Sequence, residues 1–496
     1  MGQIRQLASQ TLIYGVSSVV GRVLNYLLVP LYTAVFNPEE YGVITELYAY
    51  VAFLNIVYTY GFETAYFRFA TKSDQSEKYF NLAQTSLLLT SLIFSGLLFL
   101  GSDLIAEILG YSDQGIYIQW LSLILAIDAI VAVPFARLRL ENKAIKFASF
   151  KMLNIGLNIG LNLFFIVLCP ILSQSDSGSW IDTFYKPELG VGYIILSNLM
   201  ANAILIPLLS GYFRRLKFTL NREWMAMFLY ASPLMIMGLA GVTNEMLSRA
   251  LLKYMLPLDF YPGQSNLEIL GIFGACYKLS VFMTLAVQAF RYAFEPFFFS
   301  RAKNKDSPAL FAKIMHGFII FGSFSWLLIS ILLPDMAPVF LRQESYLTGL
   351  KIVPWLLGGG LFLGIYYNLS IWYKLTDKTH YGAWITVIGA IITIVMNVIL
   401  IPVMGYMGSA ITTFMAYLFM TTLSFLIGQK HYPVPYHVAK GSFYLFLAGG
   451  LILAFYFCDL VGLIRYLMIF GLTAIFGLSV WLIDIRTGFI KTPNRK

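Results

Sequence analysis

The chain has 496 residues, of which 58% are hydrophobic and only 12% are charged. A soluble domain carries about 25% charged residues, so the surface of so long a chain could not be kept in water. The composition therefore excludes a soluble enzyme, a nucleic-acid-binding protein and a disordered protein. Lipid is the expected solvent for most of the chain, and the positions of the +9 net charge then report on topology.

Long apolar segments follow one another along the whole chain. A membrane-spanning helix needs about 20 mostly apolar residues, and these segments are continuous, unlike the ten-residue alternation of spanning β-strands. The sequence therefore predicts an all-α polytopic membrane protein with about 14 spans, the first of them retained rather than cleaved as a signal peptide. The predicted spans are 7–36, 42–70, 79–100, 116–140, 147–171, 189–212, 224–257, 269–300, 310–334, 349–374, 381–403, 405–429, 438–458 and 462–485.

The basic residues predict the orientation of these spans. With the N-terminus inside, 25 of the 34 Lys and Arg residues fall in inner segments and 5 fall in outer segments. Cytoplasmic loops retain positive charge, and a missed or extra span would reverse the pattern downstream. We therefore expect both termini to be cytoplasmic, and we reject a basic nucleic-acid-binding patch.

An internal repeat relates the two halves of the chain. Its matched stretches keep the same order in both halves, and six spans per repeat would bring both bundles in from the same side of the membrane. We therefore expect a six-helix lobe at 1–215, a second six-helix lobe at 216–432, and two additional helices with a tail at 433–496. The matches are Gly21–Pro30 with Ser248–Pro257, Tyr41-Gly42 with Leu270-Gly271, Gly61–Phe67 with Ala293–Phe299, and Asn162 with Asn397.

Charged side chains within spans are costly and usually face a cavity or a partner. Two pairs have the i,i+4 spacing of helical ion pairs and can simply neutralise themselves. Arg22, Asp128 and Lys278 have no such local partner, which leaves pairing across helices and a water-filled cationic cavity as alternatives. Glu46 lies near a helix end and is expected to reach water. The pairs are Glu245 with Arg249 and Arg291 with Glu295.

A cationic cavity would receive an anionic headgroup, because guanidinium grips phosphate oxygens in a bidentate fashion. No catalytic motif, nucleotide-binding loop or metal-ligand cluster accompanies it in the sequence, so we expect neither an enzyme nor a metal protein. Glu39-Glu40 has the pattern of a capped helix start rather than of a metal site.

Several stretches resemble the signatures of bacterial polysaccharide-biosynthesis flippases, the Wzx-type and MurJ-type members of the multidrug/oligosaccharidyl-lipid/polysaccharide exporter superfamily. The stretches are Gly21-Arg22, Pro30-Leu31-Tyr32-Thr33, Pro38–Gly42, Gly61–Phe69 and Asn397–Ala410. The resemblance implies two lobes around a central cavity, alternating access, and transfer of an undecaprenyl-pyrophosphate-linked oligosaccharide to the outer leaflet of the bacterial inner membrane. It also implies membrane lipid, the lipid-linked glycan and other polysaccharide-assembly proteins as partners.

The same resemblance suggests roles for the charges within the spans. Family members carry cavity arginines at places that Arg22 and Arg249 match, and Arg291 is a less secure match. We assign pyrophosphate or cavity binding to Arg22, Arg249, Arg291 and Lys278. Coupling to Na⁺ or H⁺, with no other cofactor, is assigned to Glu63, Asp128, Glu245 and Glu295.

Three alternatives stay open. The peptidoglycan branch of the family, which flips lipid II, carries a two-helix extension that 433–496 could supply. A cation-coupled drug or small-molecule exporter usually has 12 helices and fewer cavity cations. A membrane glycan polymerase or transferase usually needs a larger outer loop than this chain provides.

Overall fold

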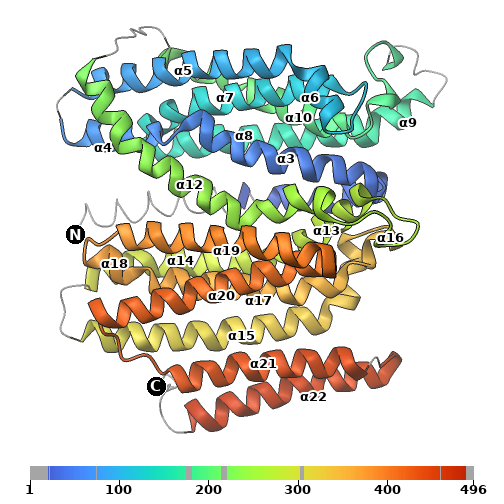
Figure 1. Cartoon of the computed structure of the whole chain (residues 1–496), viewed down its shortest axis with the longest axis vertical. Coiled ribbons are helices and arrows are strands. Elements are labelled where there is room, and N and C mark those ends of the chain that lie inside the picture. The colour runs from blue at the N-terminus through green and yellow to red at the C-terminus, as the bar shows by residue number, and fades with distance from the viewer. Residues whose placement is uncertain are drawn as a thin grey trace. The chain divides into compact units, whose positions relative to one another are not determined.

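The computed structural model describes residues 20–21, 23–73, 75–174, 181–213, 221–301, 306–458 and 460–486. Every secondary-structure element within these ranges is a helix (Figure 1). Twelve helical segments in them are long and apolar enough to cross a membrane, and two shorter apolar helices lie at Val23–Val35 and Gly192–Leu208. Each falls on one of the predicted spans, so the prediction of an all-α polytopic membrane fold is confirmed.

The helices group into two compact units, and the first comprises Met1–Lys253 and Gly263–Gly271. The repeat instead predicts a boundary at 215–216; the six-helix lobes stay a prediction. The helices of the first unit are α2 (Val29–Val35), α3 (Pro38–Thr59), α4 (Phe62–Thr71), α5 (Ser76–Leu100), α6 (Ser102–Ile108), α7 (Gly115–Leu140), α8 (Ala144–Leu163), α9 (Cys169–Ser173), α10 (Gly192–Ala203), α11 (Leu205–Leu208) and nearly all of α12 (Arg222–Met255), with short turns η1 (Phe164–Leu168), η2 (Ile181–Thr183), η3 (Pro187–Leu189) and η4 (Ser210–Tyr212).

The second unit comprises Tyr254–Pro262 and Ile272–Lys496. It contains most of α13 (Asn266–Leu279), then α14 (Val281–Arg301), α15 (Ser307–Phe340), α16 (Glu344–Leu347), η5 (Leu350–Ile352), α17 (Val353–Leu369), α18 (Ile371–Leu375), α19 (His380–Met404), α20 (Tyr406–His431), α21 (Val438–Cys458), α22 (Gly462–Val480) and η6 (Trp481–Ile485).

Local signals in the sequence set two of the helix boundaries. The side chain of Asn37 accepts a hydrogen bond from the Glu40 amide, and the Glu40 carboxylate accepts one from the Asn37 amide, each at 2.9 Å. This capping box, with Pro38 in the first turn, begins α3. Gly405 separates α19 from α20 with a φ of 56°, which glycine adopts without strain. The predicted capped start and the short connection after Met404 are therefore both confirmed.

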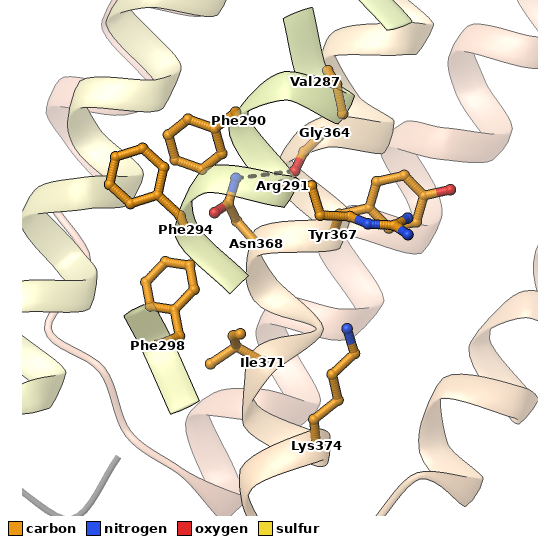
Figure 2. Close-up of a pocket in the computed structure, with 10 residues that line it drawn as sticks. All are labelled: Val287, Phe290, Arg291, Phe294, Phe298, Gly364, Tyr367, Asn368, Ile371 and Lys374. Atoms are coloured by element: carbon orange, nitrogen blue, oxygen red, sulfur yellow. Dashed lines mark hydrogen bonds between the residues drawn. The ribbon is translucent and has the colours of Figure 1, made fainter. Parts of the chain in front are cut away.

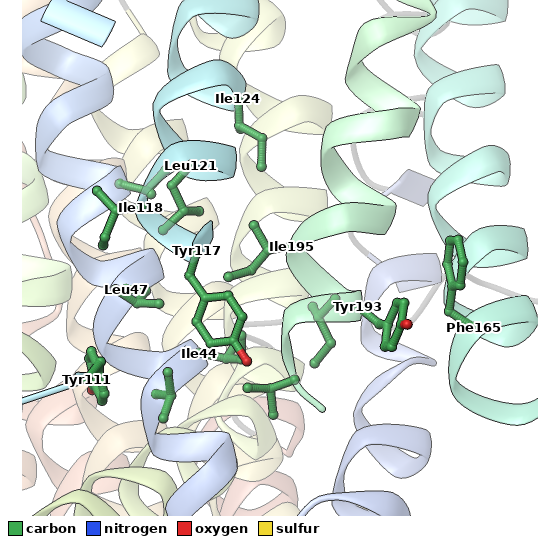
Figure 3. Packing of buried hydrophobic residues seen from close by; sticks show 14 of the residues in the cluster. Ile44, Leu47, Tyr111, Tyr117, Ile118, Leu121, Ile124, Phe165, Tyr193 and Ile195 are labelled. Atoms are coloured by element: carbon green, nitrogen blue, oxygen red, sulfur yellow. The ribbon is translucent and has the colours of Figure 1, made fainter. Parts of the chain in front are cut away.

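The core of the first unit forms around α7, whose apolar side chains face several neighbouring helices. Leu121 and Ile124 of α7 lie with Leu47 of α3 and Ile195 of α10 in one buried cluster (Figure 3). Burial of such side chains on all sides of α7 is what a helix in the centre of a bundle requires. The same packing places the polar side chains of α7 against partners on α4, α8 and α10.

Two glycines that the repeat relates to each other meet within the first unit. A Cβ atom on Gly271 would lie 1.7 Å from the Pro38 carbonyl oxygen, and one on Gly42 would lie 2.2 Å from the Leu267 carbonyl oxygen. The first turns of α3 and α13 therefore cross at backbone contact, which only glycine permits. The repeat signal at these positions thus marks a real close approach.

Candidate functional site

A small pocket in the second unit is lined by two cations together with aromatic side chains and one amide side chain. Its ten lining residues come from α14, α17 and α18 and enclose about 10 Å³, room for about one water molecule. Figure 2 shows Arg291 and Lys374 on the same side of this pocket. The lining residues are Val287, Phe290, Arg291, Phe294, Phe298, Gly364, Tyr367, Asn368, Ile371 and Lys374.

The sequence of α14 explains the orientation of Arg291. Phe290, Phe294 and Phe298 follow at i, i+4 and i+8, and their rings form a stripe with centroids 4.3 Å and 6.3 Å apart. This stripe occupies one face of the helix, so the next residue after Phe290 projects about 100° further round. The guanidinium carbon of Arg291 lies 5.1 Å from the centroid of the Tyr367 ring, a cation–π contact that holds the guanidinium plane.

The facing helix is shaped to approach α14 closely. A Cβ atom on Gly364 would lie 2.6 Å from the Phe318 ring and 2.7 Å from a Val287 methyl group. The amide of Asn368 donates a hydrogen bond of 3.2 Å to the Gly364 carbonyl oxygen. Gly364 therefore permits the close contact, and Asn368 keeps its amide on the pocket side.

Lys374 lines this pocket but has no role among the residues singled out from the sequence. It is the last residue of the predicted span 349–374, whereas α18 continues to Leu375. Lys374 follows Tyr367 by seven residues, about two helical turns, and this spacing places the two side chains on one face. That periodicity was the signal that could have found it. Lys278, in the last turn of α13, is not among the residues that line this pocket.

The predicted arginine sites of the first unit have different settings. Arg22 lies outside the described residues. Arg249 is 8% exposed on α12, and its guanidinium donates to the Met246 sulfur at 2.6 Å. Glu245, one turn earlier, is exposed. The side chain of Glu295 also lies outside the described part, so the predicted pairing of Glu295 with Arg291 stays a prediction.

Two acids of the first unit pair across helices. Glu63 of α4 forms an ion pair with Arg139 of α7, and their side chains are 39% and 38% exposed. Glu46 is fully buried, and the Lys253 ammonium lies 2.9 Å from its carboxylate and also donates to the Leu109 carbonyl oxygen at 2.6 Å. The expectation that Glu46 reaches water is therefore wrong, because the far end of α12 brings a cation to it.

Asp128 lies at the centre of a network of amides in the first unit. Asn202 donates to the Asp128 carboxylate at 2.9 Å, and Asn154 donates to the Asn202 carbonyl oxygen at 2.8 Å. Lys151, one turn before Asn154 on α8, is half-buried and interacts electrostatically with Asp128. We call Lys151, Asn154, Asn202 and Asp128 the amide cluster. It offers oxygen ligands for a cation and a carboxylate that can take up a proton.

Further amide and tyrosine pairs lie along the same helices. Asn198 donates to the Tyr48 hydroxyl at 2.8 Å, and the Tyr32 hydroxyl donates to Asn162 at 2.9 Å. Asn154, Asn158 and Asn162 recur every fourth residue, so α8 presents one polar stripe inside an apolar span. Polar side chains at membrane depth commonly mark an ion or substrate path. No group of three His, Cys, Asp or Glu side chains that could hold a metal ion occurs among the residues that the structure describes.

The comparisons with known proteins agree on the fold. Residues 34–171 match a family model described as a polysaccharide biosynthesis protein. The structure of the lipid II flippase MurJ in an inward closed conformation matches with a TM-score of 0.71 at 14% identity, over 96% of this chain and 100% of that one. No curated protein matches the chain at a significant level.

Solved structures of multidrug transporters share the fold as well. An inward-facing MATE-family multidrug transporter matches with a TM-score of 0.59 at 14% identity, over 83% of this chain and 94% of that one. A mutant of the Vibrio cholerae MATE transporter VcmN matches with a TM-score of 0.52 at 14% identity, over 86% of this chain and 96% of that one. The fold expected from the sequence resemblance is thereby confirmed.

Proposed function

We propose that the protein is a flippase that moves an undecaprenyl-pyrophosphate-linked oligosaccharide from the inner to the outer leaflet by alternating access. The observation that carries this proposal is the pairing of Arg291 and Lys374 at one pocket among the apolar helices of the second unit. The shared fold with a lipid II flippase and the match to a polysaccharide-biosynthesis family model support it.

The charged headgroup is the part of such a substrate that the bilayer excludes most strongly. A pyrophosphate cannot cross hydrocarbon uncompensated, because the desolvation of its charge has no counterpart there. Arg291 offers a planar fork for two phosphate oxygens, and Lys374 adds a compact second charge. Since the pocket itself admits about one water, the phosphates would lie at its mouth against these two side chains, and the polyprenyl tail would stay in the bilayer.

The other predicted cations complete the proposal. In this proposal Arg22 and Arg249 also bind the pyrophosphate, because they match the positions of cavity arginines in the family that the sequence resembles. Lys278 adds positive charge within the second unit. The buried setting of Arg249 is compatible with a guanidinium that is held in place before the ligand arrives.

Coupling to a cation gradient is part of the proposal. The amide cluster is its first candidate, because Asp128 is held by an amide rather than neutralised in a direct ion pair with a guanidinium. Glu245, which is exposed, and Glu295 remain candidates. Glu63 is a weaker one, since Arg139 already balances its charge. Either H⁺ or Na⁺ fits this role, and no other cofactor enters.

The proposed setting is the bacterial inner membrane, with both termini in the cytoplasm and other polysaccharide-assembly proteins as partners. A lipid II flippase is the second candidate, favoured by the TM-score of 0.71 to such a protein and by the presence of α21 and α22. A cation-coupled drug exporter and a glycan polymerase or transferase are the remaining alternatives.

Deletion of the gene tests these candidates together. The proposal predicts that complete lipid-linked repeat units build up on the inner leaflet and that the wild-type gene, but not one encoding Arg291→Ala, restores export. Accumulation of lipid II would favour the peptidoglycan branch. Drug sensitivity with normal surface glycan would favour the exporter, and unpolymerised units on the outer leaflet would favour the polymerase.

A further inference from the structure

A buried ionisable cluster lies in the second unit, and none of its residues lines the pocket of Arg291 and Lys374. Asp484 of η6 is fully buried, and the Lys440 ammonium lies 2.9 Å from its carboxylate. The His316 side chain of α15 is 2% exposed, with Nε2 3.1 Å from Asp484. The Tyr444 hydroxyl donates to the same carboxylate. Two hydrogen-bond donors of α21 and an imidazole of α15 therefore converge on one carboxylate.

A second imidazole lies beside this cluster. The ring of His437, just before α21, is 5.8 Å from the ring of His316. Unlike His316, His437 is exposed, so protons reach it directly from water. The titratable groups that face it are His316 and Lys313 of α15, Lys440 of α21 and Asp484 of η6. Burial, followed by the positive charges of His316, Lys440 and Lys313, lowers the pKa of His437, and only Asp484 acts in the opposite direction.

This cluster fastens the last two helices of the chain to α15. We call residues 438–486 the C-terminal hairpin. Its opposite end is held by the ion pair of Arg465 with Asp335 and by the Tyr456 hydroxyl, which donates to the Ser330 carbonyl oxygen at 3.0 Å. An arginine–aspartate pair does not titrate near neutral pH. Histidine does titrate near neutral pH. Among the described contacts between the C-terminal hairpin and α15, those of His316 with Asp484 and with His437 lie at the other end of the hairpin.

We propose that His316, His437 and Asp484 form a proton-binding site that fastens one end of the C-terminal hairpin to α15 near neutral pH and releases it on acidification. With the His437 imidazole neutral, the Asp484 carboxylate is balanced by Lys440. A proton on His437 adds a cation that Lys440 and Lys313 repel, while Asp484 is already balanced by Lys440. The proton comes from water at His437, no bond other than N–H forms, and the proposal does not depend on the substrate that the protein transports.

Distance measurements between two spin labels test this proposal in the full-length protein in lipid nanodiscs. The labels are placed at Ala309→Cys on α15 and Leu482→Cys on η6, both exposed positions, in a background with the exposed Cys458→Ser. We expect one distance at pH 8 and a second, longer population at pH 5, the range over which histidine titrates. A single unchanged distance at pH 5 would overturn the proposal.

Two variants and one control assign the effect to the cluster. His437→Gln, at an exposed position, is expected to keep the single distance at pH 5. Asp484→Asn removes the only carboxylate of the cluster and is expected to show the longer population at both pH values. His380→Gln, an exposed histidine on α19, should behave as wild type. If His437→Gln and His380→Gln respond to pH equally, the proton site lies elsewhere and the proposal is wrong.

Discussion

Three acids of the first unit and the two cations of the pocket in the second unit have different surroundings. In the first unit three acids have a partner from another helix: Glu46 has Lys253, Glu63 has Arg139, and Asp128 has Asn202. In the second unit Arg291 and Lys374 share one pocket whose other polar groups are a tyrosine and an amide.

This difference suggests a division of work between the two sets of residues. Carboxylates among amides suit the uptake of a cation or proton, whereas two cations at one pocket suit an anion. In the proposed flippase Arg291 and Lys374, together with Arg22 and Arg249, would bind the pyrophosphate, and the amide cluster would respond to the coupling ion.

Replacement of Arg291 should have the largest effect. Arg291→Ala removes charge-assisted hydrogen bonds worth about 1.5–3 kcal/mol, so we expect transport of lipid-linked glycan to fall about 10- to 100-fold. Arg291→Lys should recover only part of it, because lysine lacks the bidentate fork. A leaflet-specific probe of glycan in reconstituted vesicles measures both. The matched control is Lys351→Ala, an exposed cation of the same unit; an equal loss there would remove the special role of Arg291.

Neutralisation of Asp128 should impair the coupling of transport to an ion gradient. Asp128→Asn keeps a group that can accept from Asn202 but no longer takes up a proton or attracts a cation. We expect gradient-driven transport to fall about 10-fold, within the usual range of coupling free energies of about 1–3 kcal/mol, while glycan binding is retained. Transport with and without an imposed ion gradient provides the measurement.

Asp113→Asn is the control for that experiment, because Asp113 is an exposed loop residue with a left-handed backbone that asparagine also adopts. If Asp128→Asn weakened glycan binding and left the gradient dependence intact, Asp128 would act at the anion site. The coupling role of the amide cluster would then be wrong.

Lys374→Gln should cause a smaller loss than Arg291→Ala. The ammonium is a point charge without a fixed fork, so we expect its removal to cost about 1 kcal/mol and to lower glycan binding about 5-fold. Equilibrium binding to the purified protein in nanodiscs checks this. Lys378→Gln, in the connection just after α18, is the matched control and should leave binding unchanged.

Much of the fold could be predicted from the sequence, because the signals involved are local. The spans follow from apolar length, the start of α3 from its capping residues, and the break after Met404 from Gly405. Arg291 could also be singled out, since a cation inside an apolar run is visible without a structure, and its binding role stays a prediction. Orientation rests on the positions of Lys and Arg and remains a prediction.

The partners of the buried charges could not be predicted in this way. Spacing along one helix detects only neighbours three or four residues apart. Glu63 and Arg139 are 76 residues apart, and Lys253 and Glu46 are 207 residues apart. Lys374 was missed for a different reason: hydropathy ends its span at the lysine, while the helix continues around it.

The smallest expected effect concerns Glu63, and it decides whether this acid is a coupling group or a structural partner. Half-exposed ion pairs contribute about 1 kcal/mol or less, so Glu63→Gln should lower thermal stability slightly and leave the gradient dependence of transport unchanged. The exchanged pair Glu63→Arg with Arg139→Glu should restore the stability. If the exchange restored stability but abolished gradient-driven transport, Glu63 would be a coupling residue, and the acids of the first unit would differ in role despite their common pairing.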